Sequence, residues 1–197
     1  MTSGALMPAA AELTTQVVAG VNPEQLDGPT PCPEFDVRTL VNHLGQWTGD
    51  RAEKAARKQQ PPPLDESYDA IAAHGGLTEW AKVYDEKARA AGRAWAEPSA
   101  SEGETGLSGE GKMPASMVAG MVFAEYLLHG WDLAVATGQP FEPEPPVAEE
   151  LLNQLQAFAE MARQGGVFGP KVDVPPTASP FHQALALAGR NPLWPQA

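Results

Sequence analysis

The stretch AEYLLHGWDLAVATG, residues 124–138, decides the fold and raises the first question about function. Its apolar residues predict a buried helix, which can end where Gly138 takes a left-handed C-terminal position. Glu125 and His129 interrupt the apolar run four residues apart, so a helix places them one turn apart on one face. A carboxylate is costly among apolar residues unless it is paired or bound to a cation. Either the two side chains satisfy each other, or they are two ligands of a metal site.

A second helix offers a third candidate ligand. Asp36 is a suitable N-cap for VRTLVNHLGQWTGDRAEKAARK, residues 37–58, whose apolar side chains recur at helical spacing. His43 lies on the apolar face of this helix, where a lone histidine is usually an ordinary core residue. Together with Glu125 and His129 it completes a set of two imidazoles and one carboxylate. That set suits a divalent metal with open positions, such as catalytic zinc, and helical bundles build such sites from facing helices.

Residues close to the candidate ligands each have two interpretations. Asp132, three residues beyond His129, is either an acceptor that fixes the tautomer of that imidazole or a charge on the helix surface. Trp47 and Trp131 are either walls of the site or plain core residues. Cys32 lies between two prolines and close to acidic residues. Because a reactive thiol needs an electropositive setting, we interpret Cys32 as structural.

The remaining sequence predicts helices joined by long connections. Helices are expected at about residues 5–19, 37–58, 67–96 with a break at 74–76, 114–137, 147–163 and 181–188. The segment 97–112, rich in Gly, Ser and Glu, and the Pro- and Gly-rich tail predict loops. Strands, repeats and a second domain are not evident in the sequence. The pattern predicts an all-α bundle in a single domain, residues 1–197.

Composition excludes several classes of function. The net charge of −12 argues against binding to nucleic acid and to anionic membrane surfaces. No run reaches the ~18 consecutive apolar residues of a membrane helix, and the N-terminus lacks the basic region of a signal peptide. A single cysteine leaves no internal disulfide and no four-cysteine zinc site. A reducing cytoplasm is therefore the expected location.

Three motifs resemble one family. TPCPEFDVRTLVNHLGQWTGD is similar to a signature in which a T-P-C-P turn precedes a V-R-x-L-x-x-H-L helix. AEYLLHGWDLAVATGQP is similar to a second signature, E-x-x-x-H-G-W-D-L-A-x-A-T-G. FHQALALAGRNPLW resembles a closing turn that ends in G-R-D-P, with Asn191 in place of the aspartate. The family is the mycothiol-dependent maleylpyruvate isomerase N-terminal domain type, among the DinB-like metal-binding helical bundles. The motifs extend from Thr30 to Trp194 and so cover nearly the whole chain.

The resemblance implies a DinB-like four-helix bundle with an additional C-terminal helix and a loop-rich tail. It implies that His43, Glu125 and His129 hold a divalent metal, commonly zinc, and these are the residues that spacing alone selects. Some members of the family are enzymes that use mycothiol, a low-molecular-weight cytoplasmic thiol, as a cosubstrate or transfer it to electrophiles, so the resemblance implies mycothiol as the cosubstrate to test here. Arg38, about one turn before His43, could bind an acidic group of the substrate or thiol, or could be a solvated charge near the helix end.

Two functions are consistent with these features. The first is metal-dependent transfer of a thiol to a small electrophile, or isomerisation of that electrophile. The isomerase that names the family carries a further C-terminal domain, whereas residues 139–197 predict one helix and a tail, so isomerisation of maleylpyruvate itself does not follow. The alternative is a non-catalytic, metal-stabilised bundle that serves in interactions. The expected partners are a small-molecule thiol and an electrophile, without nucleic acid or membrane, and homodimerisation is left open.

Overall fold

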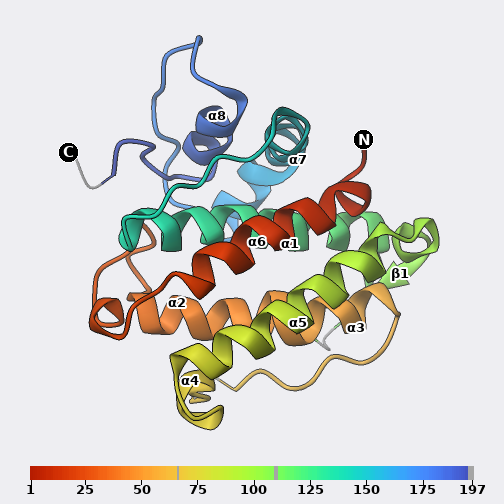
Figure 1. Cartoon of the computed structure of the whole chain (residues 1–197). Coiled ribbons are helices and arrows are strands. Elements are labelled where there is room, and N and C mark those ends of the chain that lie inside the picture. The colour runs from red at the N-terminus through yellow and green to blue at the C-terminus, as the bar shows by residue number, and fades with distance from the viewer. Residues whose placement is uncertain (66, 109–110, 195–197) are drawn as a thin grey trace.

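The chain forms a helical bundle (Figure 1), and its described residues include two very short strands. The computed structural model describes residues 1–65, 67–108 and 111–194. The bundle consists of α1 (Ser3–Ala19), α5 (Leu77–Ala96), α6 (Ala115–Ala136) and a long helical rod made of α2 (Val37–Leu44), η2 (Gly45–Arg51) and α3 (Ala52–Ala56). Both α1 and the α2–α3 rod pack against α5 and α6, which gives a four-helix arrangement. The all-α bundle predicted from the sequence is confirmed.

The central helix α6 is buried because its sequence is apolar on nearly every face. It contributes the largest group of buried residues to the core, and its two ionisable ligand candidates project between α6 and α2. Gly138 follows the end of the helix with a φ of +71°. The backbone N–H of Gln139 donates to the carbonyl of Ala134 at 2.8 Å, as in a glycine-terminated helix. The C-terminal position predicted for Gly138 is confirmed.

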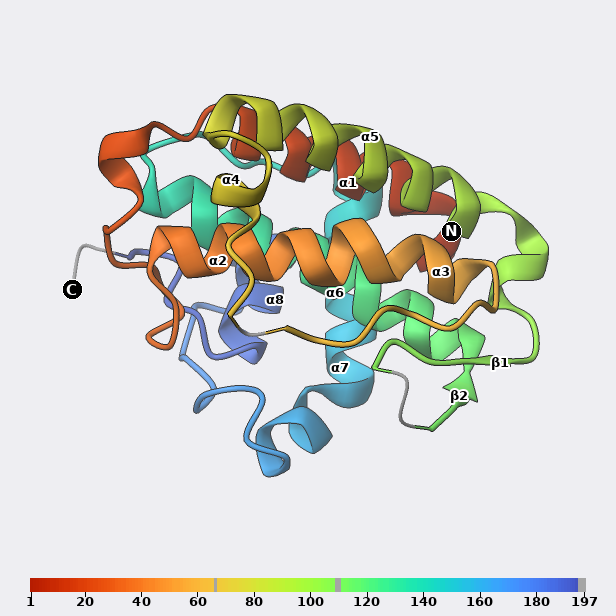
Figure 2. The same ribbon diagram turned by 90° about the horizontal axis from the view of Figure 1, so that it is seen from below.

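The rod that contains His43 is not the uniform α-helix that the sequence predicts. After α2 the backbone follows a π-helix over η2 and returns to α-helix in α3. The three segments form one continuous rod (Figure 2). A wider turn of this kind commonly occurs beside functional sites. The apolar spacing that predicts this helix ends at Trp47, which already lies inside η2, so it carries no information about the wider turns.

The other elements follow the prediction with small differences. The expected break at 74–76 separates α4 (Ala70–Ala73) from α5. The 97–112 segment, of which residues 109 and 110 lie outside the described residues, contains η3 (Pro98–Ser101) and β1 (Glu104–Thr105), and β1 pairs antiparallel with β2 (Met113–Pro114). Strands of two residues have too few positions to display an alternating pattern. A short 3-10 helix, η1 (Pro23–Gln25), lies between α1 and α2.

The C-terminal part packs on the outside of the bundle. α7 (Pro145–Gln164) contacts α1 and α6 and carries α8 (Pro180–Leu187) on its far side (Figure 1). This matches the additional helix and tail expected after the fourth helix of the bundle. None of the described helices combines the length and the apolarity that crossing a membrane requires.

Candidate metal centre

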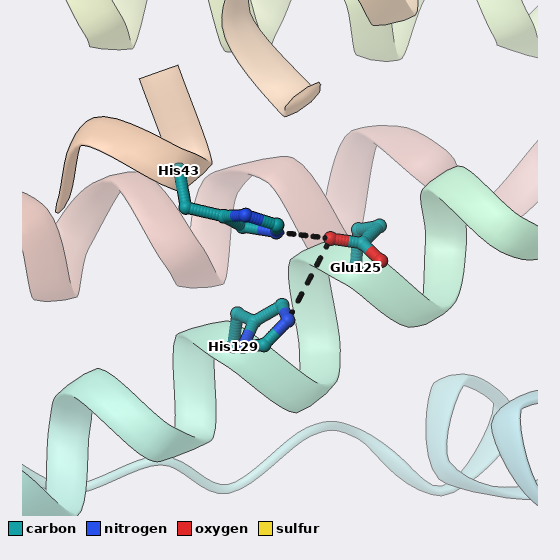
Figure 3. A group of neighbouring side chains, drawn as sticks. All are labelled: His43, Glu125 and His129. Carbon is teal, nitrogen blue, oxygen red and sulfur yellow. Dashed lines mark hydrogen bonds and ion pairs between the residues drawn. The ribbon is translucent and has the colours of Figure 1, made fainter. Parts of the chain in front are cut away.

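His43 from α2 and Glu125 and His129 from α6 converge on one point between the two helices (Figure 3). Nε2 of His43 lies 2.8 Å from Oε2 of Glu125, and Nε2 of His129 lies 3.7 Å from the same oxygen. One ligand atom from each residue lies within 4.8 Å of the other two. The convergence expected from the sequence is therefore present, although 82 positions separate His43 from Glu125.

Local structure explains why His43 faces α6. The carboxylate of Asp36 accepts a hydrogen bond from the backbone N–H of Thr39 at 2.7 Å, which confirms the predicted N-cap and sets where α2 begins. The apolar residues of α2 are buried in the core: Val37, Leu40, Val41 and Leu44. His43 lies at the edge of that buried face, so its side chain is only 19% exposed and still reaches the surface.

The donor set and its spacing fit a divalent cation. Zinc–nitrogen and zinc–oxygen bonds of about 2.0–2.2 Å in a tetrahedral site place neighbouring ligand atoms about 3.3 Å apart. The two contacts to Glu125, at 2.8 and 3.7 Å, bracket that distance, so small side-chain movements would complete the coordination. Among the described residues the group has three members, and the Cys32 thiol is not one of them. Three protein ligands leave a fourth position for water or a substrate.

Electrostatics keep Glu125 ionised. Burial would raise the pKa of this carboxyl group, but the hydrogen bond from His43 and the positive charges of His129, His43 and Arg190 outweigh burial and lower the pKa to about 2. The carboxylate side chain retains 29% exposure, so the site has an opening to solvent on this side. An ionised, accessible carboxylate is the form that binds a cation.

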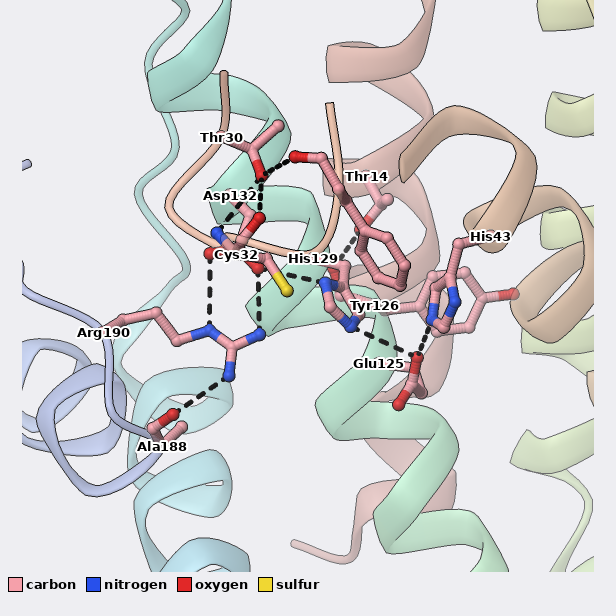
Figure 4. Close-up of polar contacts among 11 residues, drawn as sticks. Thr14, Thr30, Cys32, His43, Glu125, Tyr126, His129, Asp132, Ala188 and Arg190 are labelled. Carbon is pink, nitrogen blue, oxygen red and sulfur yellow. Dashed lines mark hydrogen bonds and ion pairs between the residues drawn. The ribbon is translucent and has the colours of Figure 1, made fainter. Parts of the chain in front are cut away.

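Asp132 occupies the supporting position that the sequence suggested. It is wholly buried, and its Oδ2 lies 3.0 Å from Nδ1 of His129 (Figure 4). The alternative interpretation of Asp132 as a surface charge is wrong. Arg190 binds the other side of this carboxylate. Burial raises the pKa of Asp132, but the charge of Arg190 and the contact with His129 lower it by more, so the group is a carboxylate.

Two aromatic rings line the imidazoles. Phe35 lies with its ring centroid 4.9 Å from that of His43 and 5.8 Å from that of His129. Trp47, one turn after His43, lies with its ring centroid 5.9 Å from that of His43, beside the candidate ligands. Trp131 lies elsewhere: it is 4% exposed, in the core, and two residues past His129 it points about 200° around α6. For Trp131 the structure supports the plain core interpretation.

The other candidates near the site have ordinary partners. Arg38 lies 3.8 Å from a carboxylate oxygen of Asp27 and 3.8 Å from one of Asp69, with 40% of its side chain exposed. This is the solvated charge at the helix end that was the alternative for Arg38. Cys32 lies beside Asp132 and Arg190, and its thiol pKa is raised, first by burial and then by the charge of Asp132. A neutral thiol agrees with the structural role expected from the sequence.

Sequence reasoning missed two residues of the site. Phe35 lies in a turn closed by a bridge between Pro29 and Asp36, and Thr30 Oγ1 lies 2.7 Å from the Phe35 carbonyl oxygen. A single phenylalanine before an N-cap carries no signal of its own. Arg190 belongs to the closing GRNP motif, which enters the sequence analysis only through the family resemblance. Its signal was an arginine in an otherwise apolar segment, where a charge requires a buried partner.

Comparisons with known proteins identify relatives and a family for this chain. Two proteins of Mycobacterium tuberculosis are each 30% identical to this chain over 189 residues, which covers 89% of this chain and 90% of theirs. They are named "Uncharacterized protein MT0763" in strain CDC 1551 / Oshkosh and "Uncharacterized protein Rv0738" in strain ATCC 25618 / H37Rv. No solved structure matches the chain.

The family description "Mycothiol maleylpyruvate isomerase N-terminal domain" matches residues 7–134. That range contains all three candidate ligands and Asp132, and it ends before the segment that supplies Arg190. The chain belongs to the mycothiol maleylpyruvate isomerase N-terminal domain family.

Proposed function

We propose that this protein binds a divalent metal, zinc in the first instance, through His43, Glu125 and His129, and uses it to activate mycothiol for transfer to, or isomerisation of, a small electrophilic substrate. The observation that carries the proposal is the convergence of three donor atoms within 4.8 Å, with the carboxylate partly open to solvent. The family name supports the choice of thiol. A cation in this position would favour the thiolate form of a thiol that binds beside it.

The residues of the chain have separate tasks in this proposal. Nε2 of each imidazole faces Glu125, so these nitrogens would hold the metal. In the metal-free geometry Nε2–H of His43 donates to Glu125, and that proton must leave before His43 can act as a ligand. Phe35 and Trp47 provide apolar walls that would exclude water and contact the uncharged part of a substrate.

The protein's own thiol is unsuited to nucleophilic attack. Cys32 is held as a neutral thiol by burial and by the charge of Asp132. A small-molecule thiol bound beside a cation would ionise more readily than Cys32, so the reaction would not depend on the protein's own thiol. Addition of the thiolate to an electrophilic carbon–carbon double bond would form a carbon–sulfur bond while the π bond breaks, and the electron pair of that π bond would take up a proton from solvent, which balances the thiol proton released when the thiolate forms.

Metal content and thiol consumption test the proposal. The purified protein loaded with zinc is expected to contain one metal per chain and to consume mycothiol in the presence of a model electrophile. His129→Ala is expected to lose both the metal and the reaction. His182→Ala, which changes an exposed histidine of α8, is the matched control and is expected to retain both.

The outcomes separate this function from its alternatives. A fully loaded protein that consumes no thiol with any electrophile tried would favour the non-catalytic, metal-stabilised bundle. Equal metal content and equal melting temperature in the wild type and His129→Ala would indicate that Glu125 and the imidazoles only form hydrogen bonds with one another and hold no metal. Size-exclusion chromatography with light scattering on the same samples tests for a homodimer.

A further inference from the structure

Arg190 is a buried cation that comes from the C-terminal tail and reaches the centre of the molecule. It is 8% exposed. Its Nη2 donates to Oδ2 of Asp132 at 2.9 Å, and its Nε donates to Oδ1 of the same carboxylate at 3.3 Å. Its Nη1 donates to the carbonyl of Ala188, just after α8, at 3.0 Å (Figure 4). The planar guanidinium therefore binds both oxygens of Asp132 and fixes the plane of that carboxylate.

The carboxylate passes this orientation on to a metal ligand. Oδ2 of Asp132, which accepts from Arg190, also lies 3.0 Å from Nδ1 of His129. With Nδ1 of His129 directed at this carboxylate, Nε2 is the nitrogen that faces Glu125 and would bind the metal. Arg190, Asp132 and His129 thus form one continuous chain of contacts from the tail to the site.

We infer that Arg190 is a positioning residue for the metal ligand His129 and that it acts through Asp132. The inference rests on the metal site of the proposed function. It assigns a role in that site to a segment outside residues 7–134, the range shared with the family. A buried carboxylate without a cation would be costly, and it would be free to rotate away from the imidazole. The two hydrogen bonds from Arg190 oppose that rotation.

Docking of the tail is the competing role for Arg190, and the chain offers a matched control for it. Arg163 of α7 donates to the carbonyls of Ala159 and Leu187, at 3.3 and 3.4 Å. Both arginines therefore bind a carbonyl at the end of α8, but only Arg190 also binds Asp132. Arg163→Met weakens the attachment of the tail without touching the supporting carboxylate.

Cobalt binding to the full chain measures the effect on the metal ligand. We compare the wild type with Arg190→Met, Arg190→Lys, Asp132→Asn, the double variant Asp132→Asn/Arg190→Met, and Arg163→Met. The readouts are the Kd for Co2+ by chelator competition and the visible absorption of the Co2+ complex, which reports the ligand geometry. The double variant contains no unpaired buried charge, so it retains a foldable reference if Arg190→Met is too unstable.

The expected results separate positioning from docking. Arg190→Met weakens Co2+ binding by about tenfold or more and shifts the absorption bands, as is usual for loss of a supporting contact. Arg190→Lys keeps the positive charge but not the bidentate hydrogen bonds to Asp132, and it is expected to recover part of the affinity for Co2+. The double variant binds as weakly as Asp132→Asn alone, because Arg190 acts only through that carboxylate. Arg163→Met lowers the melting temperature and keeps the Kd and the spectrum of the wild type.

Two results would overturn the inference. One is that Arg190→Met has the Kd for Co2+ and the absorption spectrum of the wild type. The other is that the loss of Co2+ affinity in the double variant equals the sum of the losses in the two single variants. A measurement on the metal-free proteins makes this failure distinguishable from failure of the proposed function. Imidazole 15N shifts are expected to show the Nδ1–H tautomer of His129 in the wild type and a mixture in Arg190→Met. If the wild type binds no Co2+, the metal-dependent function is contradicted. If the His129 tautomer still differs between the wild type and Arg190→Met in that case, the coupling of Arg190 to His129 is upheld.

Discussion

Glu125 is the residue that links both halves of the candidate site. Its Oε2 contacts the imidazole of His43 on α2 and that of His129 on its own helix. A carboxylate in this position is held ionised by positive partners although burial opposes ionisation. The same partners that lower its pKa would compete with a metal for its oxygen atoms. Metal binding at this site therefore exchanges one set of electrostatic contacts for another.

The pH dependence of stability tests the charge state of Glu125. Its pKa is about 2 in the folded protein, against an ordinary value of 4.5, so the unfolded chain binds more protons between these values. The stability that the ionised carboxylate contributes is fully present above about pH 4.5 and is lost as the pH falls towards 2. At neutral pH we expect the free energy of unfolding of the metal-free wild type to exceed that of metal-free Glu125→Gln by on the order of 3 kcal/mol.

Urea unfolding of both metal-free proteins from pH 7 to pH 2.5 measures this difference. The two free energies of unfolding should approach each other only at the acidic end of the range. A constant difference at every pH would show that the ionisation of Glu125 contributes nothing to stability.

At the scale of single elements, the site depends on where α2 begins and on how closely α1 approaches α6. The start of α2 is set by the Asp36 cap, seven residues before His43. The approach of α1 depends on Gly130, the neighbour of His129 in the chain. A side chain at Gly130 would have its Cβ 2.8 Å from Thr14 Oγ1 and 2.8 Å from the ring of Phe141.

Loss of the Asp36 cap should destabilise the protein without removing the metal ligands. We expect Asp36→Ala to lower the free energy of unfolding by about 0.5–2 kcal/mol, because the Thr39 N–H loses its acceptor. Asp36→Asn preserves a capping oxygen and should stay within a few tenths of a kcal/mol of the wild type. Chemical denaturation of the three proteins provides the comparison, and equal stability of the alanine variant would contradict the capping role.

Closer packing at Gly130 should be tolerated poorly. Gly130→Ala places a methyl group against Thr14 and Phe141, and we expect a loss of about 1–3 kcal/mol from overpacking. Gly49→Ala is the matched control, since its nearest neighbour would be Tyr84 at 3.6 Å, an ordinary contact. The control should be neutral or slightly stabilising, because alanine favours helix more than glycine does. Melting temperatures that fall equally in both variants would exclude a specific clash at Gly130.

At the scale of the whole molecule, the candidate centre joins three parts of the chain that are distant in sequence. α2 supplies His43, α6 supplies Glu125 and His129, and the tail beyond α8 supplies Arg190. A ligand that binds only the folded arrangement stabilises all of it by mass action. The melting temperature of the whole protein is therefore a readout of the site.

Metal addition should raise the melting temperature of the wild type. Free metal at about 100 times the Kd adds about 2.7 kcal/mol of stability, which corresponds to roughly 5–11 °C for a chain of this size. The same addition of metal should leave the melting temperature of His129→Ala unchanged. It should raise the melting temperature of His182→Ala as much as that of the wild type. Scanning calorimetry with and without a chelator provides the measurement. A rise of equal size in His129→Ala would place the bound metal elsewhere.

The sequence by itself determined the helices and the identity of the candidate ligands. Apolar residues at helical spacing predicted α2, an apolar composition predicted the buried α6, and Pro- and Gly-rich segments marked where the other helices end. Costly polar side chains in apolar helices singled out Glu125 and His129, and their four-residue spacing fixed their common face. The Asp36 cap and the Gly138 terminus were readable because both depend on local backbone chemistry.

Only the tertiary structure decided which of the neighbouring residues take part. It placed Phe35 against both imidazoles, turned Trp131 into the core and left Arg38 with acidic surface partners. It also brought Arg190 to Asp132, 58 positions away along the chain. Contacts between distant segments arise from how whole helices pack, and no local pattern of residues encodes them. The sequence could therefore name the candidate ligands, while the packing of the bundle and its tail determined which residues contact them.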